Sequence, residues 1–212
     1  MHIDRLILGE FQTNCYVLRE DDSASDCLLI DAGLDGDELL SFLTRHRLNP
    51  VAMVLTHGHV DHIVGLAALR HRFPHMRVYI HEWDADMLTD PHANLSALAG
   101  VSFTTEPADV LLRDGDMVDE AGIRLKVFHT PGHTPGGICL YAESDDVAFV
   151  GDTLFADSVG RTDFPGGDMD QLIEGIRTKL FTLPDKTVVH PGHGMRTTIG
   201  RERRSNPYVH DV

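Results

Sequence analysis

A dense group of metal-ligand side chains occupies residues 57–62 of this sequence. Its members are three histidines and one aspartate: His57, His59, Asp61 and His62. Imidazole and carboxylate are among the groups with which proteins hold first-row transition metals, and one short loop gathers several of them with little loss of entropy. The group directly follows the apolar run 51–55, which has the length of a strand. The sequence therefore predicts a metal site at the end of that strand.

Three later segments complete the ligand set, and each also follows a strand-like stretch. They supply His133 in a Thr-Pro-Gly-His motif, Asp152 in Gly-Asp-Thr and His193 in Gly-His-Gly. Five histidines and two aspartates are more ligands than one metal ion needs. We therefore expect two metal ions.

Two such ions have a definite chemistry. Two divalent cations about 3.5–4 Å apart can share a water, lower its pKa to roughly 7 and present a bridging hydroxide at neutral pH. That hydroxide is the expected nucleophile, and a metal would stabilise the charge that develops on the carbonyl oxygen of the substrate. Asp61 is expected to act as a ligand and also to accept a hydrogen bond from the hydroxide. The sequence contains no nucleophile-elbow motif for a catalytic serine.

These motifs, in this order, resemble those of the metallo-β-lactamase superfamily. The resemblance spans nearly the whole chain, from residues 11–16 to residues 206–207. It implies an α/β fold of the αββα sandwich type, with two sheets between layers of helices. It assigns to the first metal site His57, His59 and His133. It assigns to the second site Asp61, His62 and His193, with Asp152 as the carboxylate that bridges the two metals.

Within that superfamily, the chain is most similar to the short, single-domain members of the glyoxalase II group. The similarity rests on the segment 160–168 and on the segment 192–203, which begins with Gly-His-Gly. Full-length glyoxalases II continue into a helical domain that helps to hold glutathione, whereas only nineteen residues follow His193 here. We therefore expect residues 1–212 to form one domain without that helical glutathione-binding domain.

The resemblance implies a metal-dependent thioester hydrolase acting on S-D-lactoylglutathione or a related small thioester. A thiolate leaves readily, so this reaction needs no strong general acid. His59 and Asp152 distinguish this chain from two other groups of the superfamily. Zinc β-lactamases typically carry Cys or Ser at the place of Asp152, and flavodiiron proteins carry Glu at the place of His59. Zinc is the expected metal, although iron and manganese also suit a site built from nitrogen and oxygen ligands.

The substrate pocket departs from the pattern of the family. In larger glyoxalases II, a Lys and a Tyr after the bridging aspartate hold glutathione, and by position these are Arg161 and Asp163 here. A guanidinium can bind a carboxylate bidentately, so Arg161 is the predicted substrate-binding residue. The alternative is a structural ion pair of Arg161 with Asp163 or Asp157.

Two other functions remain open. Persulfide dioxygenases resemble this chain and also carry a Gly-Arg-Thr-Asp-Phe loop; by position, their single iron would be held by His57, His133 and Asp152. The segment 165–168 is more similar to the short glyoxalase group and favours the hydrolase. A non-catalytic binding protein on the same fold is disfavoured because every ligand is present.

Composition indicates which partners and which cellular compartment to expect. The formal net charge of −15 argues against nucleic acid, since affinity for phosphates depends on Lys and Arg. Three scattered cysteines, Cys15, Cys27 and Cys139, suit reduced core thiols. No apolar run has the length of a membrane span, and no signal peptide is recognisable. We expect a cytoplasmic enzyme, a monomer or small homo-oligomer, with a small thioester as its partner and no membrane association.

Hydrophobic patterning predicts strands that alternate with helices. The predicted strands are 27–30, 51–55, 77–80, 123–128, 187–189 and a hairpin of 138–141 with 147–150. The predicted helices are 38–47, 63–71 and one capped by Asp168, whose spacing to Gln171 resembles a capping box. The segment 90–107 has no clear period, and we expect a long loop over the site.

Overall fold

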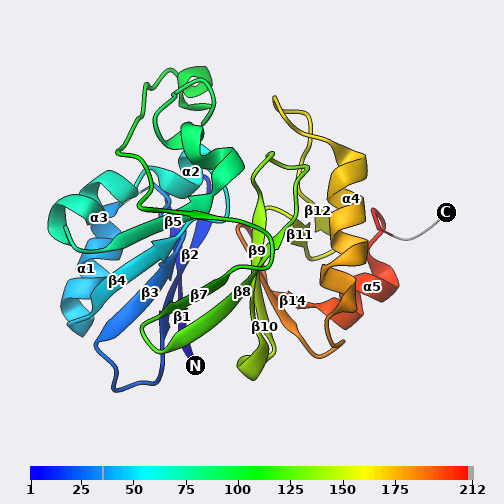
Figure 1. Ribbon diagram of the computed structural model, residues 1–212, viewed down its shortest axis with the longest axis horizontal. Helices are drawn as coiled ribbons and strands as arrows, with labels where there is room; N and C mark the ends of the chain where they lie inside the picture. The colour runs from blue at the N-terminus through cyan, green and yellow to red at the C-terminus, as the bar shows by residue number, and fades with distance from the viewer. Residues whose placement is uncertain (35, 210–212) are drawn as a thin grey trace.

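Two six-stranded sheets lie face to face between two layers of helices in the computed structural model, which describes residues 1–34 and 36–209 (Figure 1). The strands of the first sheet follow chain order: β1 (His2–Leu8), β2 (Thr13–Arg19), β3 (Asp26–Ile30), β4 (Asn49–Val54), β5 (Arg77–His81) and β6 (Val110–Leu112). The order in the second sheet is β14 (Thr197–Thr198), β13 (Val188–Pro191), β10 (Val147–Gly151), β9 (Ile138–Ala142), β8 (Ile123–His129) and β7 (Met117–Glu120).

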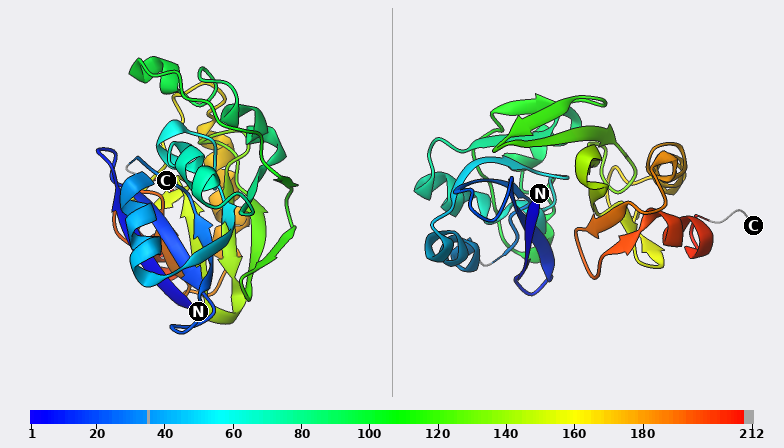
Figure 2. Two further views of the ribbon diagram at one scale, coloured as in Figure 1. Left: turned by 90° about the vertical axis from the view of Figure 1, so that its left-hand side faces the viewer. Right: turned by 90° about the horizontal axis from the view of Figure 1, so that it is seen from below.

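Helices cover the outer face of each sheet. The first sheet carries α1 (Gly36–His46) and α3 (Leu66–Arg72), with the short α2 (Val60–Ile63) near its edge, and the second carries α4 (Met169–Thr178) and α5 (Ile199–Ser205). The remaining elements are a small hairpin of β11 (Leu154–Phe155) and β12 (Ser158–Val159) and four 3-10 turns: η1 (Glu82–Leu88), η2 (Ser96–Ala99), η3 (Glu143–Asp145) and η4 (Leu180–Thr182). Seen from below, the blue and cyan elements form one half and the yellow to red elements the other (Figure 2).

Side-chain alternation explains the layers. In β2, Cys15 and Val17 pack in the cluster under α1 and α3, whereas Tyr16 and Leu18 pack between the sheets. Successive residues of a strand point to opposite faces, so a strand between two apolar layers must be apolar on both faces. A third cluster joins the second sheet to α4 and α5. The predicted αββα sandwich is confirmed.

Most predicted elements are present, and one helix differs. The hairpin of β9 with β10 is confirmed, and Asp168 caps α4 by accepting a 3.0 Å hydrogen bond from the amide of Gln171. A single helix over 63–71 is wrong, because α2 ends at Ile63 and α3 begins at Leu66. Between them, the amide of Gly65 donates to the carbonyl of Ala32 at 2.9 Å, which interrupts the helical hydrogen bonds.

Two further expectations concern the cysteines and membranes. All three cysteines are buried and free of disulfides, as expected. None of the helices in the described residues is long and apolar enough to cross a bilayer.

The fold brings the ends of strands from both sheets together. β10 and β13 run parallel, so the loops that follow them, with Asp152 and His193, leave the same edge of the second sheet. β3 and β4 are parallel in the first sheet, and β4 leads into His57. An isolated bridge between Thr13 and His193 joins the two edges. The ligand-bearing loops therefore meet where the two sheets adjoin.

Candidate metal centre

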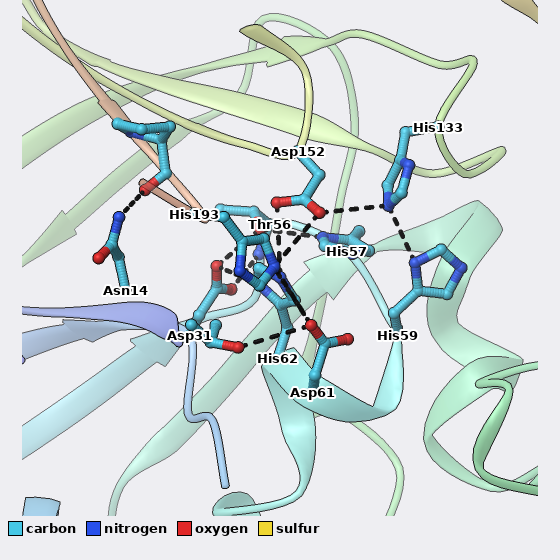
Figure 3. A network of polar contacts seen from close by, with 12 residues as sticks. Asn14, Asp31, Thr56, His57, His59, Asp61, His62, His133, Asp152 and His193 are labelled. Atoms are coloured by element: carbon cyan, nitrogen blue, oxygen red, sulfur yellow. Dashed lines mark hydrogen bonds and ion pairs between the residues drawn. The ribbon is translucent and has the colours of Figure 1, made fainter. Parts of the chain in front are cut away.

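All seven predicted ligands converge at this edge (Figure 3). They form three overlapping groups, and within each group the ligand atoms lie within 4.8 Å of one another. The groups are His57, His59 and His133; Asp61, His62 and His193; and His57, His62 and Asp152. The first two groups are those that the family resemblance assigns to the two metal sites.

The first group consists of imidazoles that face one another. Nδ1 of His59 lies 2.9 Å from Nε2 of His133, and the ring centroid of His57 lies 4.8 Å from the centroid of each. Nε2 of His57 is buried and has no hydrogen-bond partner among the described residues. A buried nitrogen without a partner is unfavourable. A cation between these nitrogens would satisfy all three.

The second group mixes imidazoles with a carboxylate. Nε2 of His193 lies 3.2 Å from both Nε2 of His62 and Oδ2 of Asp61. Burial by itself would lower the pKa of His62, but the carboxylates of Asp61, Asp31 and Asp152 raise it to about 10. The surroundings of His62 therefore favour positive charge, as a cation site requires.

Asp152 lies between the two groups. Its Oδ2 is 3.6 Å from Nε2 of His133 and 3.5 Å from Nε2 of His193, and its Oδ1 is 3.5 Å from Nε2 of His62. Oδ1 is buried and has no hydrogen-bond partner in the described part of the chain. Gly192 leaves room for it, because a Cβ there would lie 2.3 Å from Oδ1. The donor set thus fits a divalent-cation site, with Asp152 lying between its two groups of ligands.

Outer hydrogen bonds orient the imidazoles. Asp31 lies 2.9 Å from Nδ1 of His62 and accepts 2.8 Å bonds from the amide and hydroxyl of Thr56. Nδ1 of His133 lies 2.7 Å from the carbonyl oxygen of Arg161, and Nδ1 of His193 lies 3.0 Å from that of Phe11. A bond at Nδ1 leaves Nε2 free for a metal. Asp31 has no predicted role in the sequence, although its place directly after the apolar strand β3 is a signal of the same kind as those of the ligands.

A second carboxylate without a predicted role is Asp84 in η1. It is fully buried, and its oxygens accept hydrogen bonds from Gly58, Thr134 and Gly136 in the two ligand loops. Burial raises its pKa, and these hydrogen bonds act against that rise. No motif marks Asp84, since its partners lie far away along the chain.

A cavity of about 600 Å³ opens in front of the ligands. Its apolar wall includes Phe11, Leu95, Leu98, Phe155 and Phe164, and its polar wall includes five of the ligands. Because the segment 90–107 contributes Leu95 and Leu98, its expected position over the site is confirmed, although it contains the 3-10 turn η2.

The C-terminal segment supports this wall from behind. The buried carboxylate of Glu202 accepts 2.9 Å hydrogen bonds from the amide of Asp157 and from Nδ2 of Asn206. Asn206 also donates to the carbonyl oxygen of Ser158 at 2.9 Å. The β11–β12 hairpin, which carries Phe155, is held in place by these bonds.

Arg161 lines the cavity but is already paired. Its Nε and Nη2 each donate a 2.7 Å hydrogen bond to Asp163, and its guanidinium lies 3.9 Å from the centroid of the Phe164 ring. The ion pair with Asp163, the alternative considered from the sequence, is therefore present. Asp157 pairs instead with Arg201 at 2.5 Å. Substrate binding by Arg161 stays a prediction.

Comparisons with known proteins identify relatives of this chain. The sequence profile described as the metallo-β-lactamase superfamily matches residues 8–193. Among curated relatives, an uncharacterized protein of Mycobacterium leprae is 43% identical over 95% of each chain. The probable metallo-hydrolase YqgX of Bacillus subtilis is 36% identical over 97% of this chain and 96% of that one. Hydroxyacylglutathione hydrolase GloC of Haemophilus influenzae is 34% identical over 99% and 98%.

Solved structures show the same fold. The B3 metallo-β-lactamase BLEG-1 superposes with a TM-score of 0.93 at 41% identity, covering 98% of this chain and 99% of that one. TTHA1623 in a di-iron-bound form gives 0.84 at 36% identity over 97% and 99%. ETHE1 from Myxococcus xanthus gives 0.81 at 32% identity over 98% and 84%.

Proposed function

The chain belongs to the metallo-β-lactamase superfamily, and from that membership we propose that it is a dinuclear metal-dependent hydrolase of small thioesters, similar to glyoxalase II. The observation that carries the proposal is the position of Asp152 between two complete ligand groups. The relative from Haemophilus influenzae, named a hydroxyacylglutathione hydrolase, supports the reaction type. S-D-lactoylglutathione or a related small thioester is the proposed substrate.

The seven ligands would hold two divalent cations, for which zinc is proposed and iron is the alternative because TTHA1623 is di-iron-bound. When bound, such cations supply an acidified water and an electrophilic partner for a carbonyl oxygen.

Asp61 is the residue proposed to orient the attacking water. Burial by itself would raise the pKa of Asp61, but the imidazoles of His62 and His193 lower it below the usual range, so the carboxylate stays ionised. Asp61 also lines the cavity. An ionised carboxylate there accepts a hydrogen bond from the water and holds it toward the carbonyl carbon of the substrate.

The leaving group needs little help from the protein. The thiolate of a thioester leaves without protonation by a strong acid, and the apolar wall of the cavity offers none. The chain's remaining task is to orient the thioester and exclude bulk water, which the wall with Phe155 and Phe164 can do.

The second candidate is a persulfide dioxygenase with one iron. The fold does bring together the three residues that such an iron would use, His57, His133 and Asp152. The group of Asp61, His62 and His193 is not needed for a single iron, yet its ligand atoms are equally close. That second group favours the hydrolase.

One set of assays on the same purified protein separates the candidates. Metals are counted by mass spectrometry, thiol release from S-D-lactoylglutathione is followed under nitrogen, and oxygen uptake is recorded with glutathione persulfide. We expect two metals and thiol release without oxygen. One iron with oxygen uptake would establish the dioxygenase. Because one solved relative is a B3 metallo-β-lactamase, a β-lactam completes the set, and its exclusive turnover would overturn the thioester proposal.

A further inference from the structure

The cavity in front of the ligands has an apolar wall that is partly uncovered. Phe11 and Leu98 at its mouth are 56% and 75% exposed, and Leu95, Phe155 and Phe164 continue the wall inward. Apart from Leu95 and Leu98, which share the segment 90–107, these side chains come from separate stretches of the sequence. An exposed apolar patch beside a reactive centre marks a ligand surface, because contact with an apolar ligand removes it from water.

The positive charge of Arg161 on this wall is neutralised by Asp163. Among the described residues that line the cavity, histidines aside, Arg161 is the one cation. Nε and Nη2 of Arg161 each donate a 2.7 Å hydrogen bond to the carboxylate of Asp163. The ring of Phe164 covers one face of the guanidinium. A substrate carboxylate would need this same two-pronged geometry. Asp163 therefore stands where the carboxylate of an anionic thiol would bind.

We infer that the thiol portion of the substrate is uncharged and apolar, and that Asp163 sets this preference by occupying Arg161. The inference rests on the proposed thioester hydrolysis and names the substrate class for that same site. An anionic thiol such as glutathione must displace Asp163 from Arg161 and then lie beside the released carboxylate. An exposed aspartate is ionised at neutral pH even without a partner, so the released carboxylate is charged and repels the anionic thiol. An apolar thiol does not compete with Asp163 for Arg161, and its apolar group can pack on Phe11 and Leu98.

The preference for an uncharged thiol can be tested by changing the side chain of Asp163 alone. The carbonyl oxygen of Arg161, rather than its guanidinium, contacts the ligand His133. Substitution of the Asp163 carboxylate therefore alters the charge of the wall while the backbone contact with the ligand remains. Asp157 offers a matched control, because it is also exposed and paired with an arginine, but its partner Arg201 does not line the cavity, whereas Arg161 does.

The experiment compares two thioesters that share the D-lactoyl group, one of glutathione and one of benzyl mercaptan. We expect the wild-type protein to prefer the benzyl thioester in kcat/KM. Asp163→Asn should shift the preference toward glutathione by about threefold or more, since exposed ion pairs are worth a small factor. Asp157→Asn should leave the preference unchanged. The double variant Arg161→Ala with Asp163→Asn should lose the shift, because the freed guanidinium is then absent.

The outcomes separate this inference from the proposed function. If the wild type hydrolyses both thioesters and prefers glutathione, or if Asp163→Asn does not alter the preference, the inference is overturned and the hydrolase stands. If neither thioester is cleaved, the hydrolase fails. Calorimetric titration of the metal-replete protein with benzyl mercaptan and with glutathione then decides the inference, because both present a CH2–SH group and differ in the apolar or anionic portion that carries it. Tighter binding of glutathione would overturn it, and tighter binding of benzyl mercaptan with the Asp163→Asn shift would support it.

Discussion

Oδ2 of Asp84 accepts a 2.7 Å hydrogen bond from the hydroxyl of Thr134, and this contact ties the turn η1 to the loop of the ligand His133. The same carboxylate accepts a 2.6 Å bond from the amide of Gly136 and a 3.2 Å bond from the amide of Gly58. Gly58 lies between the ligands His57 and His59. One buried carboxylate that binds no metal therefore sets the distance between loops that hold ligands of the first site.

Asp84→Asn should weaken metal binding by about 10- to 100-fold, the usual effect of removing an outer partner of metal ligands. An amide has one acceptor oxygen in place of two, so at least one donor of the ligand loops is left unpaired in the interior. Competition with a chromophoric chelator measures the affinity. Asp86→Asn, an exposed change in the same 3-10 turn, is the control. Equal affinity in both variants would show that Asp84 does not position the loops.

Asp152→Ala should abolish the metal pair. The carboxylate lies about equally far from ligands of both sites, and its negative charge offsets the repulsion between two cations. Metal counting on the purified variant should give one ion or none per chain, with thioester hydrolysis lost. A wild-type stoichiometry of one, together with full activity of His62→Ala, would instead contradict the dinuclear site.

Gly192→Ala should displace Asp152 and His62 through a steric clash, without removing any ligand. The added Cβ would lie 2.3 Å from Oδ1 of Asp152 and 2.7 Å from Cε1 of His62, which are distances that no packed structure tolerates. We expect reduced metal content and a lower melting temperature. Gly36→Ala is the control, because a Cβ there meets neighbours at ordinary contact distances of 3.4 Å and beyond. Normal metal content in Gly192→Ala would mean that the loop moves aside without loss.

His190 should make the fold less stable in mild acid. Burial, with Arg196 and Arg5 nearby, lowers its pKa to about 4, and its ring stacks on Phe149. Between pH 6.5, the usual value for the unfolded chain, and pH 4, the unfolded state binds a proton that the folded state does not, so the free energy of unfolding falls as the pH is lowered.

His190→Phe should remove this part of the pH dependence. At pH 5 it amounts to roughly 1–2 kcal/mol for a shift of this size. Denaturant unfolding of metal-free wild type and variant at pH 7 and pH 5 measures the difference, with the metal ligands common to both proteins. The same loss of stability in both would show that His190 does not contribute.

The sequence by itself determined the parts of this protein that depend on residue type and short spacing. The ligands of residues 57–62 are neighbours along the chain, and the apolar strands before each ligand loop follow from local pattern. The cap formed by Asp168 and Gln171 spans one helical turn, so it too was readable. In each case the interacting groups, or the pattern that places them, lie within a few residues.

Tertiary structure alone decided the features that join distant segments. Asp84 reaches Gly136 across more than fifty residues, and the break between α2 and α3 depends on a hydrogen bond from Gly65 to Ala32. Arg161 and Asp163 are only two residues apart, but a substrate carboxylate would compete for the same guanidinium. The sequence pattern does not show which of the two partners Arg161 binds. Such choices depend on which groups approach one another when the sheets pack, because a buried polar group takes whatever partner the fold brings within reach.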